Sequence, residues 1–271
     1  MRARYFVSLA ALCLLSLVVA EKNHAQTANF QDRFNDWKDV RLDPKGTFWI
    51  WSNRELRLYT TDSLFLSQSF NSFGNIHSID PSNPLKALAF FKEQGRLVFL
   101  DNSGSPLAEG VQLMDLGMDQ ATAACLSYDN GFWLFLSNEM RLVRFDKQLN
   151  ITVDVPNVNV LAEVSELHPV FMAEAGRYVF ILDNDGPLLV FDIFGGFMQK
   201  NQGPKPGKCM DWHTGGVEDA QQGLRIFRGK KGVTLPIKAP ENLPKSADYW
   251  MGKEDQYISI SGDSLSFYRF R

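Results

Sequence analysis

Four short segments of the sequence share one pattern, a run of mostly apolar residues that ends in Ser-Asn or Asp-Asn. Measured from asparagine to asparagine, the segments recur after 49, 36 and 46 residues. They span residues 48–53, 97–102, 133–138 and 179–184. β-branched and aromatic residues favour strands, and Asn, Asp and Gly accept the positive φ of a tight turn. The pattern therefore predicts a repeated β-hairpin.

Further candidate strands surround these units. In three of the four units a second strand follows the turn, at 56–59, 142–146 and 188–192. Other candidate strands lie upstream or downstream, at 87–91, 123–128, 64–66 and 151–155. Four short strands in a unit of roughly 40 residues is the plan of a β-propeller blade.

Two weaker units, at 224–227 and 257–260, continue the series towards the C-terminus. The sequence therefore predicts an all-β fold, a β-propeller of about six four-stranded blades, with five or seven blades left open by the two degenerate units. A many-stranded β-sandwich is the alternative, and the regular spacing favours the propeller. Because an open ring exposes sheet edges, we expect a strand within residues 30–40 to complete the last blade.

The N-terminal segment differs in kind from the rest. Arg2 and Arg4 precede an apolar run at 5–20, and a polar stretch follows. This arrangement predicts a signal peptide over residues 1–25, cleaved after Ala20 or Ala25, and a single propeller domain over 26–271. The alternative is an uncleaved anchor, although the run is just shorter than the roughly 17 to 25 residues of a spanning helix. No later stretch approaches that length, so no membrane span is expected after cleavage, and the protein is predicted to be periplasmic or secreted.

Charge and cysteine content narrow the class further. The formal net charge is -3, and the basic residues are scattered among acidic ones, which leaves no footprint for nucleic acid. Outside the predicted signal peptide the chain has two cysteines, Cys125 and Cys209. Two buried or free thiols in different blades are the favoured interpretation, and one long-range disulfide is the alternative in an oxidising compartment.

The repeated units resemble those of the divergent extracytoplasmic propellers, a group that includes NHL-type, quinoprotein-like and WD40-like repeats. The resemblance lies in strand pattern and period over nearly the whole chain after the predicted signal peptide. The signatures of the individual subfamilies are absent: there is no Gly-His to Trp-Asp pattern, no kelch double glycine and no Ala-x-Asp-x-x-Gly run. The resemblance implies a binding platform and leaves the subfamily unassigned.

Candidate chemistry is sparse. Three histidines lie outside the predicted signal peptide, at His77, His168 and His213, and no two have the spacing of a metal pair. The segment 209–216 gathers a thiol, a carboxylate and an imidazole, but neighbours on a strand face opposite sides, so it does not predict a catalytic group. We therefore predict no catalytic, cofactor-binding or metal-binding residues.

Aromatic residues divide into two groups. The first group occupies consecutive apolar positions of predicted strands and is interpreted as core: Phe48, Trp49, Trp51, Phe132, Trp133 and Phe135. Aromatic residues in less regular segments, together with His213, predict a recognition surface: Trp37, Trp212, His213, Tyr249 and Trp250.

The predicted function is that of an exported, non-enzymatic binding or scaffold protein of the cell envelope, which presents propeller loops to a protein or glycan partner. The alternative is a hydrolase or lyase that acts on a carbohydrate or an ester in the central channel. Fold alone does not decide between them, because function resides in sites carried by folds. The oligomeric state does not follow from the sequence.

Overall fold

The computed structural model describes the backbone of residues 28–184, 187–202, 210–213, 216–219, 223–228, 231–235, 249–253 and 255–269. Side chains are described for residues 28–184, 187–201, 251–252 and 255–269. The predicted signal peptide at 1–25 lies outside these residues, so its presence and its cleavage site stay predictions.

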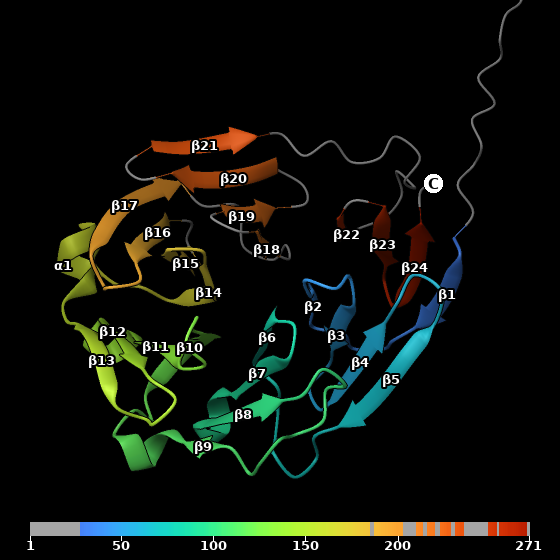
Figure 1. The fold of residues 1–271 in the computed structure, drawn as a ribbon, viewed down its shortest axis with the longest axis horizontal. Coiled ribbons are helices and arrows are strands. Elements are labelled where there is room, and N and C mark those ends of the chain that lie inside the picture. The colour runs from blue at the N-terminus through green and yellow to red at the C-terminus, as the bar shows by residue number, and fades with distance from the viewer. Residues whose placement is uncertain are drawn as a thin grey trace, which may run out of the picture.

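The described strands form six antiparallel sheets of four strands each, as the repeat predicts. Figure 1 shows the sheets as the blades of a ring, with the first strand of each blade nearest the centre. Blade 1 contains β2 (Asp39–Leu42), β3 (Phe48–Trp51), β4 (Glu55–Tyr59) and β5 (Leu64–Ser69). Blade 2 contains β6 (Ser78–Asn83), β7 (Lys86–Phe91), β8 (Arg96–Leu100) and the short β9 (Val111–Gln112).

The next two blades follow the same order from the centre outwards. Blade 3 contains β10 (Ala121–Leu126), β11 (Phe132–Leu136), β12 (Arg141–Phe145) and β13 (Ile151–Val155). Blade 4 contains β14 (Pro169–Ala175), β15 (Tyr178–Asp183), β16 (Pro187–Asp192) and β17 (Phe197–Gln202).

Blade 5 contains β18 (Met210–His213), β19 (Gly216–Asp219), β20 (Gly223–Arg228) and β21 (Lys231–Leu235). Blade 6 combines both ends of the domain. It contains β22 (Tyr249–Lys253), β23 (Gln256–Ser261), β24 (Ser264–Arg269) and, as its outer strand, β1 (Phe30–Arg33). β1 pairs antiparallel with β24, with Phe30 opposite Phe267 and Arg33 opposite Ser264. The expectation that a strand within residues 30–40 closes the ring is confirmed.

The two ends of the ring are different in structure. Because consecutive strands of a blade are antiparallel, the connections alternate between the two ends. One end, which we name the helical face, carries η1 (Lys92–Gln94), η2 (Leu113–Leu116), η3 (Ser137–Glu139) and α1 (Val158–Ala162). The other end, which we name the hairpin face, carries the tight turns at 43–47, 101–105, 127–131, 146–150 and 192–196.

Aspartates close four turns of the hairpin face in the same way. In each turn the Asp carboxylate accepts hydrogen bonds of 2.8 or 2.9 Å from the backbone N–H groups two and four residues later. The aspartates are Asp43, Asp101, Asp146 and Asp192. The residue at the fourth position has a positive φ and is glycine in three of the turns, whereas Leu149 adopts this strained conformation in the other.

The hydrophobic core lies between neighbouring blades. Trp51 of blade 1 packs with Phe91 of blade 2, and Trp133 of blade 3 packs with Phe191 of blade 4. The six aromatic residues interpreted as core, from Phe48 to Phe135, are buried with exposures of 2% or less, which confirms that interpretation. Cys125 is a buried free thiol on β10, and Cys209 lies outside the described residues.

One repeat unit was aligned wrongly in the sequence. Residues 97–102 form the third strand of blade 2 and its following turn, because β8 pairs with β7 on one side and β9 on the other. The other three units are second strands. The second strand of blade 2 ends in Phe91-Lys92 and carries no Asn, so the pattern matched the neighbouring strand. This shift explains the uneven spacing of 49 and 36 residues.

Helices are few and short in the described part of the chain. The longest, α1, has five residues. None of the described helices is long and apolar enough to cross a membrane.

Candidate functional site

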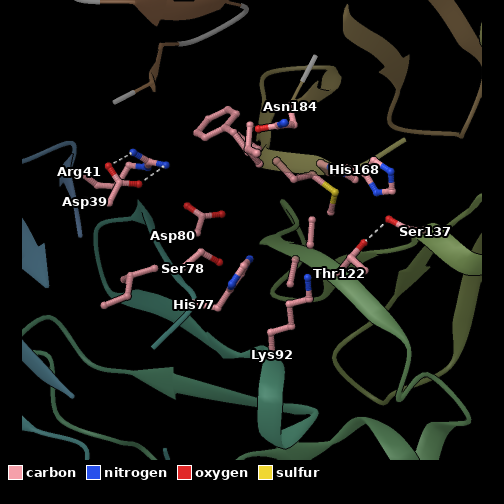
Figure 2. A pocket seen from close by; sticks show the side chains of 18 residues that line it. Asp39, Arg41, His77, Ser78, Asp80, Lys92, Thr122, Ser137, His168 and Asn184 are labelled. Atoms are coloured by element: carbon pink, nitrogen blue, oxygen red, sulfur yellow. Dashed lines mark hydrogen bonds and ion pairs between the residues drawn. The ribbon is translucent and has the colours of Figure 1, made fainter. Parts of the chain in front are cut away.

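A cavity of about 370 Å³ opens at the centre of the helical face. Its walls come from the inner strands of blades 1 to 4, β2, β6, β10 and β14, and from the turns that follow β7, β11 and β15 (Figure 2). A second hollow of about 460 Å³ adjoins it and shares His77, Lys92 and Thr122. The helical face is therefore concave at its centre.

An ion pair from blade 1 forms one end of the cavity. Arg41 is buried and contacts Asp39 through two nitrogen–oxygen pairs, at 2.8 and 2.9 Å. The Arg41 guanidinium also lies 4.9 Å from the ring centre of Phe171, which belongs to blade 4 on the opposite side of the ring. Arg41 therefore spans the channel at this depth, with Asp39 neutralising its charge.

Asp80 of blade 2 has a structural role within the same cavity. Its carboxylate accepts hydrogen bonds from the backbone N–H of Leu126 in blade 3, at 2.8 Å, and of Ser82, at 2.9 Å. Burial raises the pKa of Asp80, because desolvation of the carboxylate outweighs these hydrogen bonds and the attraction of Arg41. Asp80 thus joins two blades, and its oxygens are already occupied.

The mouth of the cavity carries positive charge. Lys92 is exposed and, among the described residues, forms no hydrogen bond or ion pair through its ammonium group. Within the described part of the chain, the Lys38 ammonium donates one long hydrogen bond, to the carbonyl oxygen of Ile76 at 3.5 Å. Although solvent reaches its side chain, the pKa of His77 is lowered to about 4, first by desolvation and then by the charges of Lys92 and Lys38, with Glu93 opposing them. His77 is therefore a neutral imidazole near pH 7.

The opposite rim of the cavity is polar and mostly uncharged. His168 is exposed, and its Nε2 lies 3.6 Å from a carboxylate oxygen of Glu166. The hydroxyl groups of Thr122 and Ser137 share a hydrogen bond of 2.6 Å. Figure 2 shows His77 with Lys92 on one side of the cavity and His168 on the other. The mouth can thus contact a ligand through imidazole, ammonium and hydroxyl groups.

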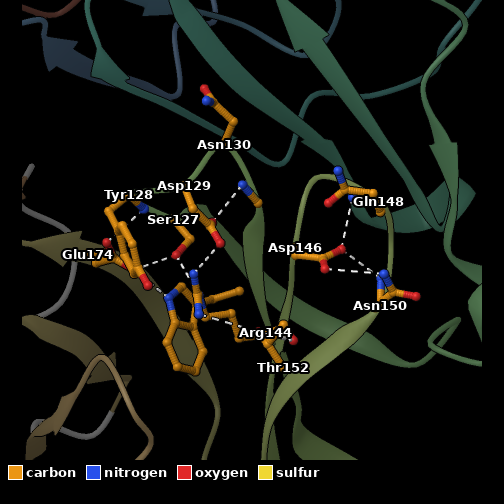
Figure 3. Close-up of polar contacts among 12 residues, drawn as sticks. Ser127, Tyr128, Asp129, Asn130, Arg144, Asp146, Gln148, Asn150, Thr152 and Glu174 are labelled. Atoms are coloured by element: carbon orange, nitrogen blue, oxygen red, sulfur yellow. Dashed lines mark hydrogen bonds and ion pairs between the residues drawn. The ribbon is translucent and has the colours of Figure 1, made fainter.

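A second polar cluster lies at the hairpin face, where Glu174 of blade 4 meets blade 3 (Figure 3). The Glu174 carboxylate accepts hydrogen bonds from the Ser127 hydroxyl at 2.7 Å, the Tyr128 backbone N–H at 2.8 Å and the Trp133 indole N–H at 2.6 Å. Burial raises the pKa of Glu174, even though these hydrogen bonds and Arg144 act in the opposite direction. The cluster ties blade 4 to blade 3.

Arg144 completes this cluster from within blade 3. Its guanidinium donates to the Ser127 hydroxyl at 2.8 Å and lies 2.5 Å from the Asp129 carboxylate. It also covers the Tyr128 ring at 4.5 Å. Every charged group of this cluster therefore has a partner inside the fold, which indicates a structural role.

Of the five residues predicted to form a recognition surface, Trp37 has a described side chain. It is half-buried, packs on the core between blades 6 and 1, and donates its indole N–H to the carbonyl oxygen of Gly262 at 2.9 Å. Trp37 therefore connects the β1–β2 segment to blade 6, and a role in recognition stays a prediction.

The other four predicted residues lie on inner strands. Trp212 and His213 belong to β18, which contacts β14 and β2, two strands that line the cavity. Tyr249 and Trp250 belong to β22, the inner strand of blade 6. Their side chains are outside the described residues, so their roles also stay predictions. The topology nevertheless assigns all four to the strands nearest the channel.

The residues that the sequence did not single out are His77, Lys92 and His168 as a set. They are 15 and 76 residues apart along the chain. One signal was present: His77 directly precedes β6 and His168 directly precedes β14, so an alignment of the repeats by inner strand gives both histidines the same position. The sequence also did not single out the exposed aromatic side chains that the structure describes, which are Phe65, Tyr128 and Phe194.

No group of three or more metal-ligating side chains occurs among the described residues. Asp39 and Asp80, the two carboxylates that line the cavity, are engaged by Arg41 and by backbone N–H groups. A carboxylate held in this way is poorly placed to accept a proton from a substrate. The two carboxylates are therefore better suited to holding the blades together than to acid–base chemistry.

Together, the six blades, the closure by β1 and the central cavity define a β-propeller of highly divergent sequence. No protein-family model matches the chain, and no curated protein matches it. Solved structures show the same fold. A streptogramin B lyase has a TM-score of 0.53 and 10% identity over 89% of this chain and 87% of that one. The WD40 domain of Neurospora crassa Pan2 has a TM-score of 0.53 and 10% identity over 87% and 78%.

A virginiamycin B lyase from Staphylococcus aureus is also similar, with a TM-score of 0.50 and 9% identity over 87% of this chain and 80% of that one. Similarity at this level of identity establishes the fold. Because the same fold occurs in a lyase and in a WD40 domain, the function has to be inferred from the site.

Proposed function

We propose that the chain is an exported, non-enzymatic binding protein of the cell envelope, which presents its helical face to a protein partner. The support for export is the segment at 1–25, where Arg2 and Arg4 precede an apolar run. Sequencing the N-terminus of the protein recovered outside the cytoplasm tests this step, with Glu21 or Gln26 expected as the first residue. A protein that retains Met1 in the cytoplasm would contradict it.

The observation that carries the proposal is the set of side chains that the helical face exposes to solvent. This face combines a hollow mouth with exposed apolar side chains in the connections between blades. At the mouth, the ammonium group of Lys92 has no partner among the described residues. Met114 of η2 is 74% exposed, Val160 of α1 is 70% exposed, and Val170 at the cavity rim is 47% exposed. Exposed apolar groups near polar ones are typical of protein interfaces.

A protein partner is favoured over a glycan. Sugar rings pack against exposed aromatic faces, and the exposed aromatic side chains described are not on the helical face. Tyr128 and Phe194 lie in turns of the hairpin face, and Phe65 lies on the outer strand β5. The apolar groups of the helical face are aliphatic or thioether side chains, which pack well against a protein surface.

The proposal is tested by capturing partners from envelope extracts with two matched double variants. Met114→Asp with Val160→Asp places charges on the helical face, and Leu85→Asp with Phe194→Asp does so on the hairpin face. The expected result is one stoichiometric partner that the helical-face variant loses, at least tenfold in recovered amount, and the hairpin-face variant keeps. Loss in the hairpin-face variant alone, or no stoichiometric partner at all, would overturn the proposal.

A hydrolase or lyase acting in the channel is the second candidate, and one observation favours it. His77 and His168 line the same cavity from two blades, and neutral imidazole is a common general base. If a panel of esters and polysaccharides includes a substrate, its turnover should fall at least a hundredfold in both His77→Ala and His168→Ala. Turnover that survives either substitution would remove this candidate.

A further inference from the structure

The cavity of the helical face has two chemically different parts. Part of its interior is apolar, with Ile79 from blade 2, Ala123 from blade 3, and Phe171 and Met172 from blade 4 among the lining residues, and the buried polar groups there are the Arg41–Asp39 pair and Asp80. Its mouth carries Lys92 and His77. A volume of about 370 Å³ lies in the range of pockets that hold small organic molecules. The cavity therefore matches a small ligand with an apolar body and one polar end.

The charge at the mouth of the cavity indicates whether the polar end of the ligand should be anionic or cationic. The carboxylates that line the cavity are already engaged, Asp39 by Arg41 and Asp80 by two backbone N–H groups, and Glu93 at the mouth accepts a hydrogen bond from the amide of Asn75 at 3.0 Å. The ammonium of Lys92 has no such partner among the described side chains. Moving a carboxylate from water to this mouth would place it within reach of an unpaired cation and of an imidazole that can take up a proton.

Anion binding would also relieve an existing repulsion. Lys92 and Lys38 both lie close enough to His77 to disfavour its protonation, and Glu93 only partly offsets them. Like charges that crowd a mouth in this way are stabilised by a bound counter-charge. The groups facing His77 are thus mostly cationic, and a neutral or cationic ligand would leave their repulsion in place.

We propose that the cavity binds a small carboxylic acid with an aromatic or branched apolar body. The carboxylate lies between Lys92 and His77 at the mouth, and the apolar body packs against Ile79, Phe171 and Met172. This inference goes beyond the proposed docking of a protein partner, because it concerns a small molecule inside the cavity and does not depend on the surrounding face.

The test compares an acid with its uncharged isostere. Naphthalene-1-acetate and naphthalene-1-acetamide have the same apolar body, and phenylacetate with phenylacetamide form a smaller pair. Isothermal titration calorimetry with the full protein after signal removal should show each acid binding more tightly than its amide, by about tenfold for the better pair, which corresponds to about 1.4 kcal/mol.

Three variants locate the binding. Lys92→Gln should weaken the acid about fivefold to tenfold and leave the amide unchanged, since only the charge contact is lost. Lys147→Gln, an exposed lysine in a turn of the hairpin face, is the matched control and should change neither. Val170→Trp fills the rim of the cavity from a position that is already 47% exposed, and it should abolish binding of both ligands.

A second readout is independent of affinity. A carboxylate beside His77 favours the imidazolium form, so binding should raise the pKa of His77 from about 4 towards neutrality. Proton NMR of the His77 ring across a pH titration, with and without naphthalene-1-acetate, measures this shift. The His77→Gln variant assigns the signal, because the resonance that disappears from its spectrum belongs to His77.

Equal affinity for acid and amide, unchanged binding in Lys92→Gln or Val170→Trp, or no binding of either acid at millimolar concentration would overturn the inference. Its failure is distinguishable from failure of the proposed function. If the partner is captured while the acids do not bind, docking on the helical face stands and the small-molecule site falls. If the acids bind while no partner is captured, the reverse holds.

Discussion

The turns and the Glu174 cluster of the hairpin face and the cavity mouth of the helical face use their polar groups in opposite ways. On the hairpin face, carboxylates close turns and join blades, as Asp192 does within its turn and Glu174 does between blades 4 and 3. On the helical face, Lys92 and His77 form no such bonds within the described chain. A group without an internal partner does not stabilise the fold, so it is free to meet a ligand. The comparison separates the structural end of the ring from the binding end.

The largest loss of stability is expected on the hairpin face, at Glu174. Glu174→Ala leaves the Ser127 hydroxyl, the Tyr128 N–H and the Trp133 indole N–H without an acceptor, so unfolding free energy should fall by about 3 to 5 kcal/mol. Chemical denaturation followed by tryptophan fluorescence measures this. The matched change on the helical face, Glu166→Ala, removes an exposed contact to His168 and should cost less than about 0.5 kcal/mol. Similar losses in the two variants would show that the polar groups of the two faces do not differ in how much they stabilise the fold.

The turns of the hairpin face should show a smaller effect. Asp192→Ala removes two hydrogen bonds to the backbone N–H groups of Phe194 and Gly196, at 2.9 and 2.8 Å, and should destabilise the protein by about 1 to 2 kcal/mol. Asp119→Ala is the control on the helical face, where the carboxylate accepts one exposed hydrogen bond from Gln120. A control that costs as much as the turn variant would contradict the assignment.

The pH dependence of stability should reveal the lowered pKa of His77 in the folded protein. Its pKa is about 4 in the folded protein and about 6.5 in the unfolded chain, so between these values the unfolded state takes up the proton and the folded state does not. His77 therefore leaves stability unchanged above about pH 6.5, and stability falls as the pH decreases towards 4, because the unfolded chain is protonated first. Denaturation at pH 7 and pH 5 should show wild type losing more stability than His77→Gln, by less than about 1 kcal/mol because the ring is exposed. Equal losses would show that the folded pKa is not lowered.

The smallest effect is expected at Lys92. Because its ammonium has no partner among the described residues, Lys92→Gln should change the free energy of unfolding by less than about 0.5 kcal/mol. Thermal unfolding beside the wild type gives this value. A loss above about 1 kcal/mol would mean that Lys92 stabilises the fold, as the polar groups of the hairpin face do.

The sequence predicts the propeller because the repeat is local. Each blade needs apolar strands at short range and residues that accept tight turns, and both are visible in segments such as 133–138 and 179–184. The alignment failed in blade 2, where Phe91-Lys92 replaces the Asn-bearing end and the next strand imitates it. The pattern identified a strand correctly but could not say which of the four positions it occupies.

The cavity could not be predicted in the same way. Its lining comes from four blades, and the distance between Lys92 and His168 in sequence says nothing of their common position at the mouth. Whether a charged residue is engaged also depends on tertiary contacts: Asp80 and Glu174 meet blade 3 only in the folded ring. The aromatic pattern did lead to β18 and β22, the two inner strands that carry Trp212, His213, Tyr249 and Trp250.

The closure of blade 6 has a consequence for the order of events during synthesis. β1 is made before any other strand of the ring, yet its partner β24 is the last, and the paired residues Gln31 and Ser266 are 235 positions apart. The ring therefore cannot close until β24 has emerged from the ribosome or a translocation channel. A chain exported in the unfolded state gains its final contacts only on the far side, and either predicted cleavage, after Ala20 or Ala25, leaves β1 whole for that step.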